Sequence, residues 1–274
     1  GQAEAAGHPA QRPHPRRPVN ATRRRVLRQG GLALSSTGLA GLAGCGAWAV
    51  PQAGPMELLH LDDSGPYAAP TLLVMLPGAY SAPQEFVDEG FVRALRQRRM
   101  PVDVVIAGAR IEHYVEGRVL ERLREQVIAP ARARGVRSVW LLGISLGGLF
   151  ALAYAARHPG EISGLITLAP YLGRRTLYAE IVAAGGPAAW ARGRKAQADD
   201  QLEHDVWAWL GSGSATPLPT LGYGLEDRFA ESHRLLASLL PATQVITAAG
   251  GHDWPAWRAL WLQCLERHLL PVGG

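Results

Sequence analysis

A serine of this chain stands in a local sequence that is typical of an activated nucleophile. Residues 138–143 form an apolar run of strand length, and a helix-like run begins at residue 146. Between them lies a G-x-S-x-G pattern, Gly143-Ile144-Ser145-Leu146-Gly147. In a strand–turn–helix context this pattern exposes a serine hydroxyl on a strained turn, and flanking glycines avoid collisions across it. We therefore predict that Ser145 is a nucleophile; the alternative is a glycine-rich turn with an ordinary surface serine.

A serine nucleophile needs a base and an acid, and both residue types follow Ser145 in the chain. His252 lies in the run Gly250-Gly251-His252-Asp253-Trp254, where two glycines let a loop bring the imidazole over the serine. Asp227 lies between a predicted strand and a predicted helix, where a loop can aim its carboxylate at a histidine. His252 would accept the serine proton and return it to a leaving alcohol. Asp227 would fix the imidazole tautomer and stabilise the imidazolium.

Other acids and histidines compete for these two roles. Glu226 directly precedes Asp227 and would point elsewhere if Asp227 points inward. Asp253 adjoins His252, and neighbouring residues rarely face each other well. His233 lies inside a predicted helix, where we expect it on the surface. Three further histidines lie in loop-like regions or at a helix end, namely His113, His204 and His158.

The elements that must position these residues alternate between strand-like and helix-like segments. Apolar runs of strand length, rich in Val, Leu and Ile, occur at 71–76, 102–107, 138–143, 164–169, 217–222 and 243–248, and 56–62 adds a possible edge strand. Helical patterns occur near 84–99, 116–134, 146–157, 228–239 and 256–270. Continuous apolar strands separated by helices are typical of a parallel sheet that is buried on both faces. The sequence therefore predicts an α/β domain with a doubly wound, mostly parallel sheet.

On these residues, the segment 71–254 resembles the α/β-hydrolase superfamily, and within it the small group that includes esterase D and feruloyl esterases. The resemblance rests on the chain order Ser145, Asp227, His252, each after a predicted strand, and on the Gly-Gly-His-Asp-Trp run. It implies the α/β-hydrolase fold and a serine hydrolase that cleaves carboxylic esters through an acyl-enzyme intermediate. The implied partner is a small-molecule acyl ester, and no cofactor is implied.

Two backbone N–H groups are candidates for an oxyanion hole. One belongs to Leu146, the residue after the nucleophile. The loop after strand 71–76 reads Leu76-Pro77-Gly78-Ala79-Tyr80. The resemblance places a His-Gly or Pro-Gly pair at this position and the second donor on the next residue, which is Ala79, with Tyr80 as the second choice. The alternative interpretation is a plain Pro-Gly turn.

The N-terminal residues have the pattern of an export signal. The basic residues of 22–28 are followed by an apolar, small-residue run from Gly30 to Gly44, too short to span a membrane as a mature helix. The segment resembles a twin-arginine signal with Arg23-Arg24 as the pair. The run Leu42-Ala43-Gly44-Cys45 resembles a bacterial lipobox, which implies a lipid on Cys45 and a membrane anchor; an ordinary signal cut near Ala47 or Ala49 is the alternative.

These patterns divide the chain into an export signal at 1–44, a tether at 45–55 rich in Gly, Pro and Ala, and a hydrolase domain at 56–274. Residues 1–44 have a net charge of +6 against +5 for the whole chain, so the remainder has a net charge of −1. The basic character thus belongs to the signal, which argues against nucleic-acid binding. The sequence has no metal-ligand cluster, phosphate loop or dinucleotide fingerprint.

Substrate specificity is not predictable from the sequence. Residues 174–213 contain Trp190, Trp207 and Trp209 together with several arginines, and they form either a small helical lid over an acyl pocket or ordinary helices packed on the sheet. An acyltransferase or a thioesterase could use the same three residues. A non-catalytic envelope lipoprotein with this fold is a further alternative, although it would have no use for all three groups. No oligomeric state is predicted.

Overall fold

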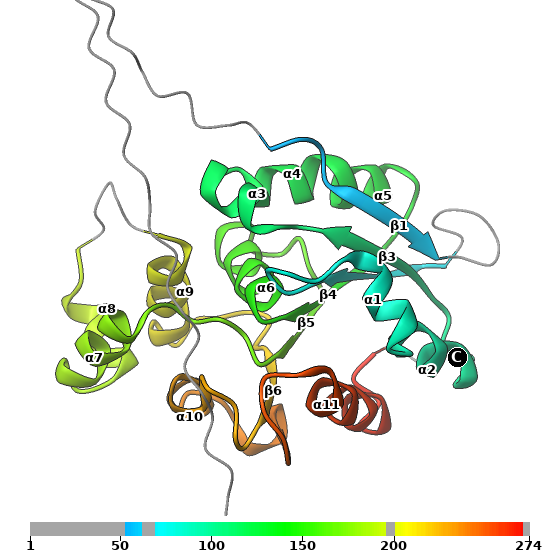
Figure 1. The fold of residues 1–274 in the computed structure, drawn as a ribbon. Coiled ribbons are helices and arrows are strands. Elements are labelled where there is room, and N and C mark those ends of the chain that lie inside the picture. Colours follow the sequence, from blue (N-terminus) through cyan, green and yellow to red (C-terminus); the bar gives the residue numbers. More distant parts are fainter. Residues whose placement is uncertain (1–52, 62–68, 196–200, 271–274) are drawn as a thin grey trace, which may run out of the picture. The chain divides into compact units, whose positions relative to one another are not determined.

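Seven strands of the described residues form one sheet in the computed structural model, in the order β1-β3-β2-β4-β5-β6-β7 (Figure 1). The structure describes residues 53–61, 69–195 and 201–270. Strand β1 runs antiparallel to β3, and every other neighbouring pair is parallel. This arrangement confirms the predicted mostly parallel α/β sheet. The strands are β1 Glu57–Leu61, β2 Thr71–Leu76, β3 Val102–Gly108, β4 Ser138–Ile144, β5 Gly164–Leu168, β6 Thr220–Gly224 and β7 Val245–Ala248.

Helices cover both faces of this sheet (Figure 1). One face packs against α1 Pro83–Asp88, α2 Phe91–Gln97 and α11 Trp254–Glu266. The other face packs against α3 Ile111–Glu116, α4 Val119–Leu123, the π-helical turn Arg124–Ile128, α5 Ala129–Ala133, α6 Leu146–Arg157, α9 Leu202–Gly211 and α10 Ala230–Ala237. The helices α7 Arg175–Ala183 and α8 Pro187–Gly193 join the same core, with α8 packed on α9.

Alternate side chains of one strand serve the two cores, as a doubly covered sheet requires. In β2, Leu72 and Val74 belong to the core beneath α6, whereas Leu73 and Met75 belong to the core beneath α11. All four side chains are fully buried. The continuous apolar run at 71–76 follows from this double burial, since neither face of the strand meets water.

Several predicted boundaries differ from the observed ones for local reasons. The helix predicted at 84–99 is two helices, because Gly90 adopts a left-handed backbone (φ 80°) between α1 and α2. Strand β6 begins at Thr220 rather than 217, since Pro217 and Pro219 have no N–H to donate to a neighbouring strand. Helix α6 begins and ends at the predicted residues 146 and 157.

The last helix, predicted near 256–270, packs an apolar face against the sheet. Trp257, Leu260 and Trp261 are buried against the sheet. Cys264 lies on the same face of α11, and burial raises the pKa of its thiol to about 12. Its thiol is therefore protonated at neutral pH and poorly reactive.

The predicted export signal, its Arg23-Arg24 pair and Cys45 lie outside the described residues. Within the ranges that the structure describes, no helix is both long and apolar enough to cross a bilayer.

Candidate active site

Ser145 lies at the junction of β4 and α6, on the strained turn that its sequence predicts. Its backbone has φ 53° and ψ −116°, a region that non-glycine residues rarely occupy. The turn is tight: a Cβ on Gly147 would lie 2.1 Å from the Leu76 carbonyl oxygen, and one on Gly143 would lie 2.2 Å from the Gly147 carbonyl oxygen. Glycine is thus required on both sides of Ser145, because backbone occupies the space of a side chain.

The structure brings Ser145, His252 and Asp227 into one hydrogen-bonded chain. His252 Nε2 lies 2.9 Å from Ser145 Oγ, and His252 Nδ1 lies 2.8 Å from Asp227 Oδ2. Ser145 follows β4, Asp227 follows β6 and His252 follows β7, so all three lie at the carboxyl ends of parallel strands. This edge of an open α/β sheet is where loops converge to form sites.

The charge of Asp227 fixes the directions of these hydrogen bonds. Burial alone would raise the pKa of Asp227, but hydrogen bonds from His252 and from the Phe229 backbone N–H (2.7 Å to Oδ1) hold it below its ordinary value. The carboxylate is therefore ionised at neutral pH and can only accept. His252 must then donate from Nδ1, which leaves Nε2 free to accept the proton of Ser145 Oγ–H.

Aromatic rings hold the imidazole of His252 from two sides. Phe229 and Trp257 meet it edge-on, with ring centroids 5.1 Å and 5.2 Å away and interplanar angles of 87° and 89°. The side chain of Asp227 is fully buried behind it. These contacts exclude most solvent and restrict rotation of the ring. Trp257 lies in the helix predicted near 256–270, but its contact with His252 depends on a loop path that no local pattern reveals.

The competing acids have structural roles in the same loops. The Gly250 N–H donates to Glu226 Oε2 (2.5 Å), which ties the loop of His252 to the loop of Asp227. Asp253 caps α11 by accepting the Ala256 N–H at 3.1 Å. Neither carboxylate faces the His252 ring in the way that Asp227 does.

The other candidate histidines also have structural roles, and the predicted surroundings of three of them were wrong. His233 is fully buried in α10 instead of lying on its surface, and it donates from Nε2 to the Pro170 carbonyl at 3.0 Å. Burial lowers its pKa to about 4, so its ring is neutral at neutral pH. His113 and His204 lie in α3 and α9 and not in loops, because each accepts a backbone N–H at the start of its helix. His158 packs against Tyr154. The spacing of apolar residues in a short helix such as α10 distinguishes its faces, but it does not show which face other elements cover, so the burial of His233 was not predictable from it.

The loop predicted to supply the second oxyanion donor lies directly beside Ser145. A Cβ on Gly78 would lie 3.5 Å from Ser145 Cβ, so the Pro77-Gly78 turn approaches the serine closely. Leu146 is the first residue of α6, where the backbone N–H has no partner within the helix. Ala79 is half-buried and Tyr80 is 91% exposed. The roles of Leu146 and Ala79 as oxyanion donors stay predictions.

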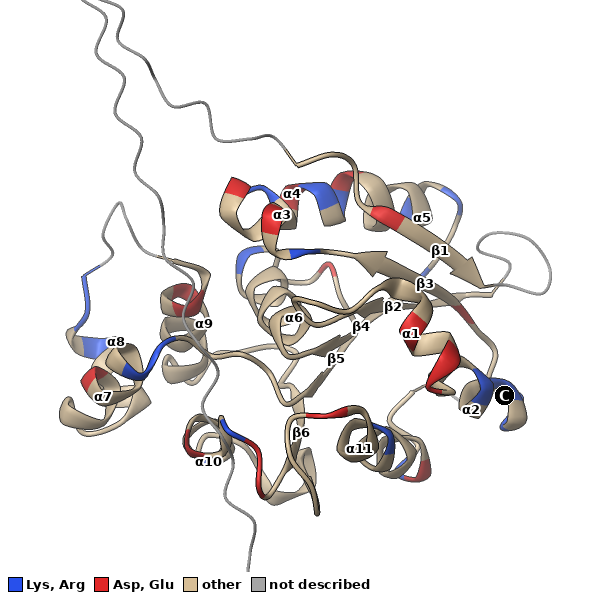
Figure 2. Ribbon diagram, viewed as in Figure 1, with Lys and Arg blue, Asp and Glu red and all other residues tan. Residues whose placement is uncertain are grey.

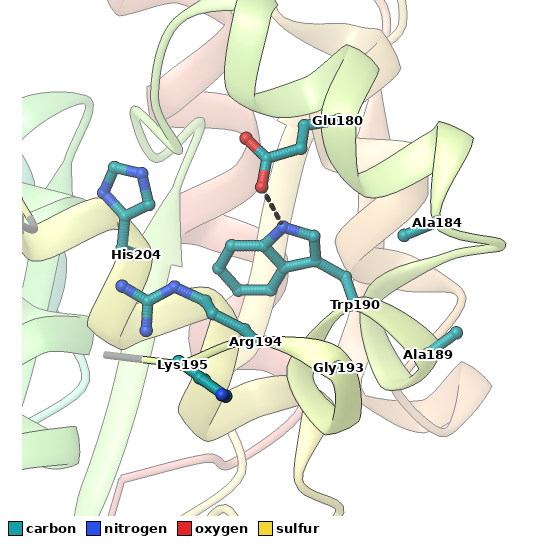
Figure 3. A pocket seen from close by; sticks show the side chains of 8 residues that line it. All are labelled: Glu180, Ala184, Ala189, Trp190, Gly193, Arg194, Lys195 and His204. Carbon is teal, nitrogen blue, oxygen red and sulfur yellow. Dashed lines mark hydrogen bonds between the residues drawn. The ribbon is translucent and has the colours of Figure 1, made fainter. Parts of the chain in front are cut away.

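Within the segment 174–213, the described residues on either side of 196–200 form α7, α8 and α9. Helix α9 packs against α6, and Trp207 donates from Nε1 to the Leu172 carbonyl at 2.8 Å. Among α7, α8 and α9 is a cavity of about 480 Å³ (Figure 3). Trp190 donates to Glu180 across it (2.6 Å), and Arg194 lies over the indole. Whether this segment also moves as a lid stays a prediction.

In the ranges that the structure describes, no group of three or more His, Cys, Asp or Glu side chains is arranged to hold a metal ion.

A family model described as serine aminopeptidase, S33, matches residues 118–199 of the chain. The match includes Ser145 but ends before Asp227 and His252, and it spans less than half of the sequence. No curated protein matches the chain.

Solved structures resemble the chain along most of its length. One is FphF of Staphylococcus aureus, described as a fluorophosphonate-binding serine hydrolase, with a TM-score of 0.55, 13% identity and coverage of 80% of this chain and 100% of that one. Another is S-formylglutathione hydrolase (FrmB) of the same organism, with a TM-score of 0.51, 12% identity and coverage of 81% and 99%. A third is Est1E from Butyrivibrio proteoclasticus, with a TM-score of 0.53, 17% identity and coverage of 77% and 93%. At these identities the likeness concerns the fold alone, and the chain has the α/β-hydrolase fold.

Proposed function

We propose that this chain is a serine hydrolase that cleaves carboxylic esters of small molecules, with Ser145, His252 and Asp227 as its catalytic residues. The observation that supports this most is the chain of two hydrogen bonds, 2.9 Å and 2.8 Å long, that joins the three side chains, with Ser145 on a strained turn. Such a constellation is recognised by its geometry and by the roles of its members.

In the proposed reaction, Ser145 Oγ attacks the ester carbonyl carbon while His252 Nε2 accepts its proton. The negative charge on the carbonyl oxygen would be stabilised by the N–H groups of Leu146 and Ala79. The carbon–oxygen bond to the alcohol then breaks, and His252 donates the proton to the leaving alcohol. A water molecule, deprotonated by His252, releases the acid from the acyl-enzyme and restores Ser145. Asp227 stays ionised throughout and keeps the imidazole in the required tautomer.

Labelling and kinetics on the full chain test this proposal. A fluorophosphonate probe should attach to Ser145, as peptide mass spectrometry can show, and Ser145→Ala should not be labelled. Hydrolysis of a 4-nitrophenyl ester by Ser145→Ala should fall by several orders of magnitude while its melting temperature stays close to that of the wild type. A variant that keeps more than a tenth of the wild-type turnover would remove Ser145 from the mechanism. Turnover of aminoacyl anilides without turnover of esters would contradict the choice of substrate class.

We also propose that the protein is exported and held at a membrane by a lipid on Cys45. The support is the order of the basic run, the apolar run and the cysteine in the sequence.

A further inference from the structure

A small cleft lies beside the candidate catalytic residues, between the segment that follows β5 and the start of α10. Its volume is about 140 Å³. Among the residues that line it are two aromatic ones, Tyr171 and Phe229, and three basic ones, Arg174, Arg175 and Arg228.

The inner wall of this cleft is shared with the catalytic residues. The Tyr171 N–H donates to the backbone carbonyl of Ser145 at 2.8 Å. The ring of Phe229 lies 5.1 Å from the ring of His252 and 5.8 Å from the ring of Tyr171. One aromatic layer therefore separates the cleft from the imidazole that would transfer the proton. A molecule held in the cleft at one end would have to extend past this aromatic layer to bring its other end to Ser145.

The cleft is positively charged. Arg174, Arg175 and Arg228 are all exposed, and none of them forms a salt bridge within the part of the chain that the structure describes. Glu231 is the opposing carboxylate among the lining residues, so the three arginines leave a net positive charge there. Figure 2 shows basic residues at the start of α7 and in the loop that leads into α10.

Two of these arginines stand where a helix does not favour them. Arg174 is the N-cap of α7 and Arg175 its first residue, and α7 has no acidic residue in its first turn. The N-terminus of a helix has a partial positive charge, which favours acids and disfavours cations. Together, the helix end and the guanidinium groups concentrate positive charge on one wall of the cleft. Residues that destabilise their own helix are expected mainly at functional sites.

We propose that this cleft binds an anionic group of the substrate, a carboxylate or a phosphate, so that the protein acts on esters that have a negative charge in addition to the scissile bond. This inference rests on the proposed hydrolase function. The planar guanidinium group suits both anions, because its N–H donors pair with two oxygens at once. Tyr171 and Phe229 would shield the bound anion from water on the side of His252.

Matched pairs of esters test the inference with the full chain. The first pair, the 4-nitrophenyl monoester of adipic acid and 4-nitrophenyl hexanoate, places the charge on the acyl side. The second set places it on the alcohol side, with phenyl acetate as the neutral reference for 4-carboxyphenyl acetate and 4-acetoxyphenyl phosphate. After correction for uncatalysed hydrolysis, kcat/KM should be at least about tenfold higher for the charged member on one side, which corresponds to one well-placed charged hydrogen bond. The ratio should fall as salt is added. The last two esters distinguish a carboxylate from a phosphate.

Substitutions then locate the preference. The double variant Arg174→Gln with Arg228→Gln should lower the ratio of kcat/KM for charged over neutral ester by about tenfold. Arg137→Gln replaces an exposed arginine directly before β4, at the amino end of that strand and so away from the carboxyl ends where the candidate site lies, and it should keep the wild-type ratio. A loss of folding or of catalytic geometry lowers kcat/KM for both esters and cancels in the ratio, and kcat/KM for the neutral ester alone reports it.

Two results would overturn the inference. One is equal or slower hydrolysis of the charged esters on both sides, and the other is a ratio that the double variant leaves unchanged. Labelling of Ser145 by the fluorophosphonate together with either result would overturn this inference and leave the proposed function intact. If the wild type is neither labelled nor able to hydrolyse any of the esters, the proposed function is overturned, and this inference falls with it.

Discussion

Asp227 is held as an anion by two hydrogen bonds that outweigh its burial. The substitution Asp227→Asn keeps the shape of this side chain but allows an N–H to face His252, so the imidazole would carry its proton on the wrong nitrogen. We expect kcat on a 4-nitrophenyl ester to fall on the order of 10⁴-fold with little change in melting temperature.

Glu226→Gln is the matched control, one residue away. Glu226 accepts the Gly250 N–H, and a glutamine oxygen can accept it as well, so activity should stay within about threefold of the wild type. The opposite behaviour of the two variants would move the acid role from Asp227 to Glu226.

His233 links the pH of the solution to the stability of the fold. Its pKa in the folded state is about 4, below the ordinary value of 6.5, because burial disfavours its charged form. Between these two values the unfolded chain binds more protons, so the free energy of unfolding rises with pH. The part of the free energy of unfolding that depends on a neutral His233 is fully present above about pH 6.5 and is lost as the pH falls towards 4. Its size is on the order of 3 kcal/mol.

Urea unfolding at pH 7 and pH 4.5 measures this effect. His233→Gln should lose less stability than the wild type between the two pH values. His268→Asn, an exposed histidine on a left-handed backbone that Asn tolerates, should lose as much as the wild type. Parallel behaviour of His233→Gln and the wild type would contradict the assignment of this pH dependence to His233.

At the scale of elements, the loops after β6 and β7 lie so close that one glycine controls their spacing. A Cβ on Gly224 would lie 2.2 Å from the Gly250 carbonyl oxygen and 2.8 Å from that of Gly251. Gly224→Ala must therefore push the loop of His252 away from the loop of Asp227. A shift of about 1 Å is enough to lower kcat/KM on the order of 100-fold.

Gly193→Ala provides the control for the Gly224 variant. Gly193 ends α8, and a Cβ there meets no atom within 4 Å. Its kcat/KM and melting temperature should match those of the wild type or rise slightly. Ester turnover by Gly224→Ala above half of the wild-type value would show that the two loops are less tightly coupled than their contact indicates.

The sequence predicts these elements best where one local rule acts alone. Helix α6 has its predicted bounds, because the G-x-S-x-G turn starts it within one residue. The sheet core is predictable, since strands covered on both faces are apolar throughout. The break at Gly90 and the late start of β6 are harder to predict, because glycine is tolerated within helices and proline at strand ends. The burial of His233 and the cleft between Arg174 and Arg228 depend on segments far apart in the chain, which no local pattern brings together.

For the molecule as a whole, the proposed export signal leads to a prediction of where the protein resides. If Cys45 carries two or more acyl chains, the wild type should partition with membranes, because two chains anchor a protein stably whereas one does so only marginally. The Cys45→Ser variant has no site for these chains and should be released. The pair Arg23→Lys with Arg24→Lys should keep the protein in the cytoplasm. Cell fractionation and N-terminal sequencing measure both effects. A wild-type protein that is wholly soluble, with its N-terminus beyond Cys45, would contradict the anchor and leave the proposed hydrolase function unaffected.

The burial of Cys264 makes its alkylation a measure of how often α11 separates from the sheet. The chain has two cysteines, so the Cys45→Ser variant has a single thiol, which lies on the buried face of α11. Burial holds this thiol in its protonated form, which alkylating reagents attack slowly. The rate at which such a reagent consumes it therefore reports how often α11 leaves the sheet. Trp257, which contacts His252, lies on the same helix, so departure of α11 from the sheet would also remove this contact of His252.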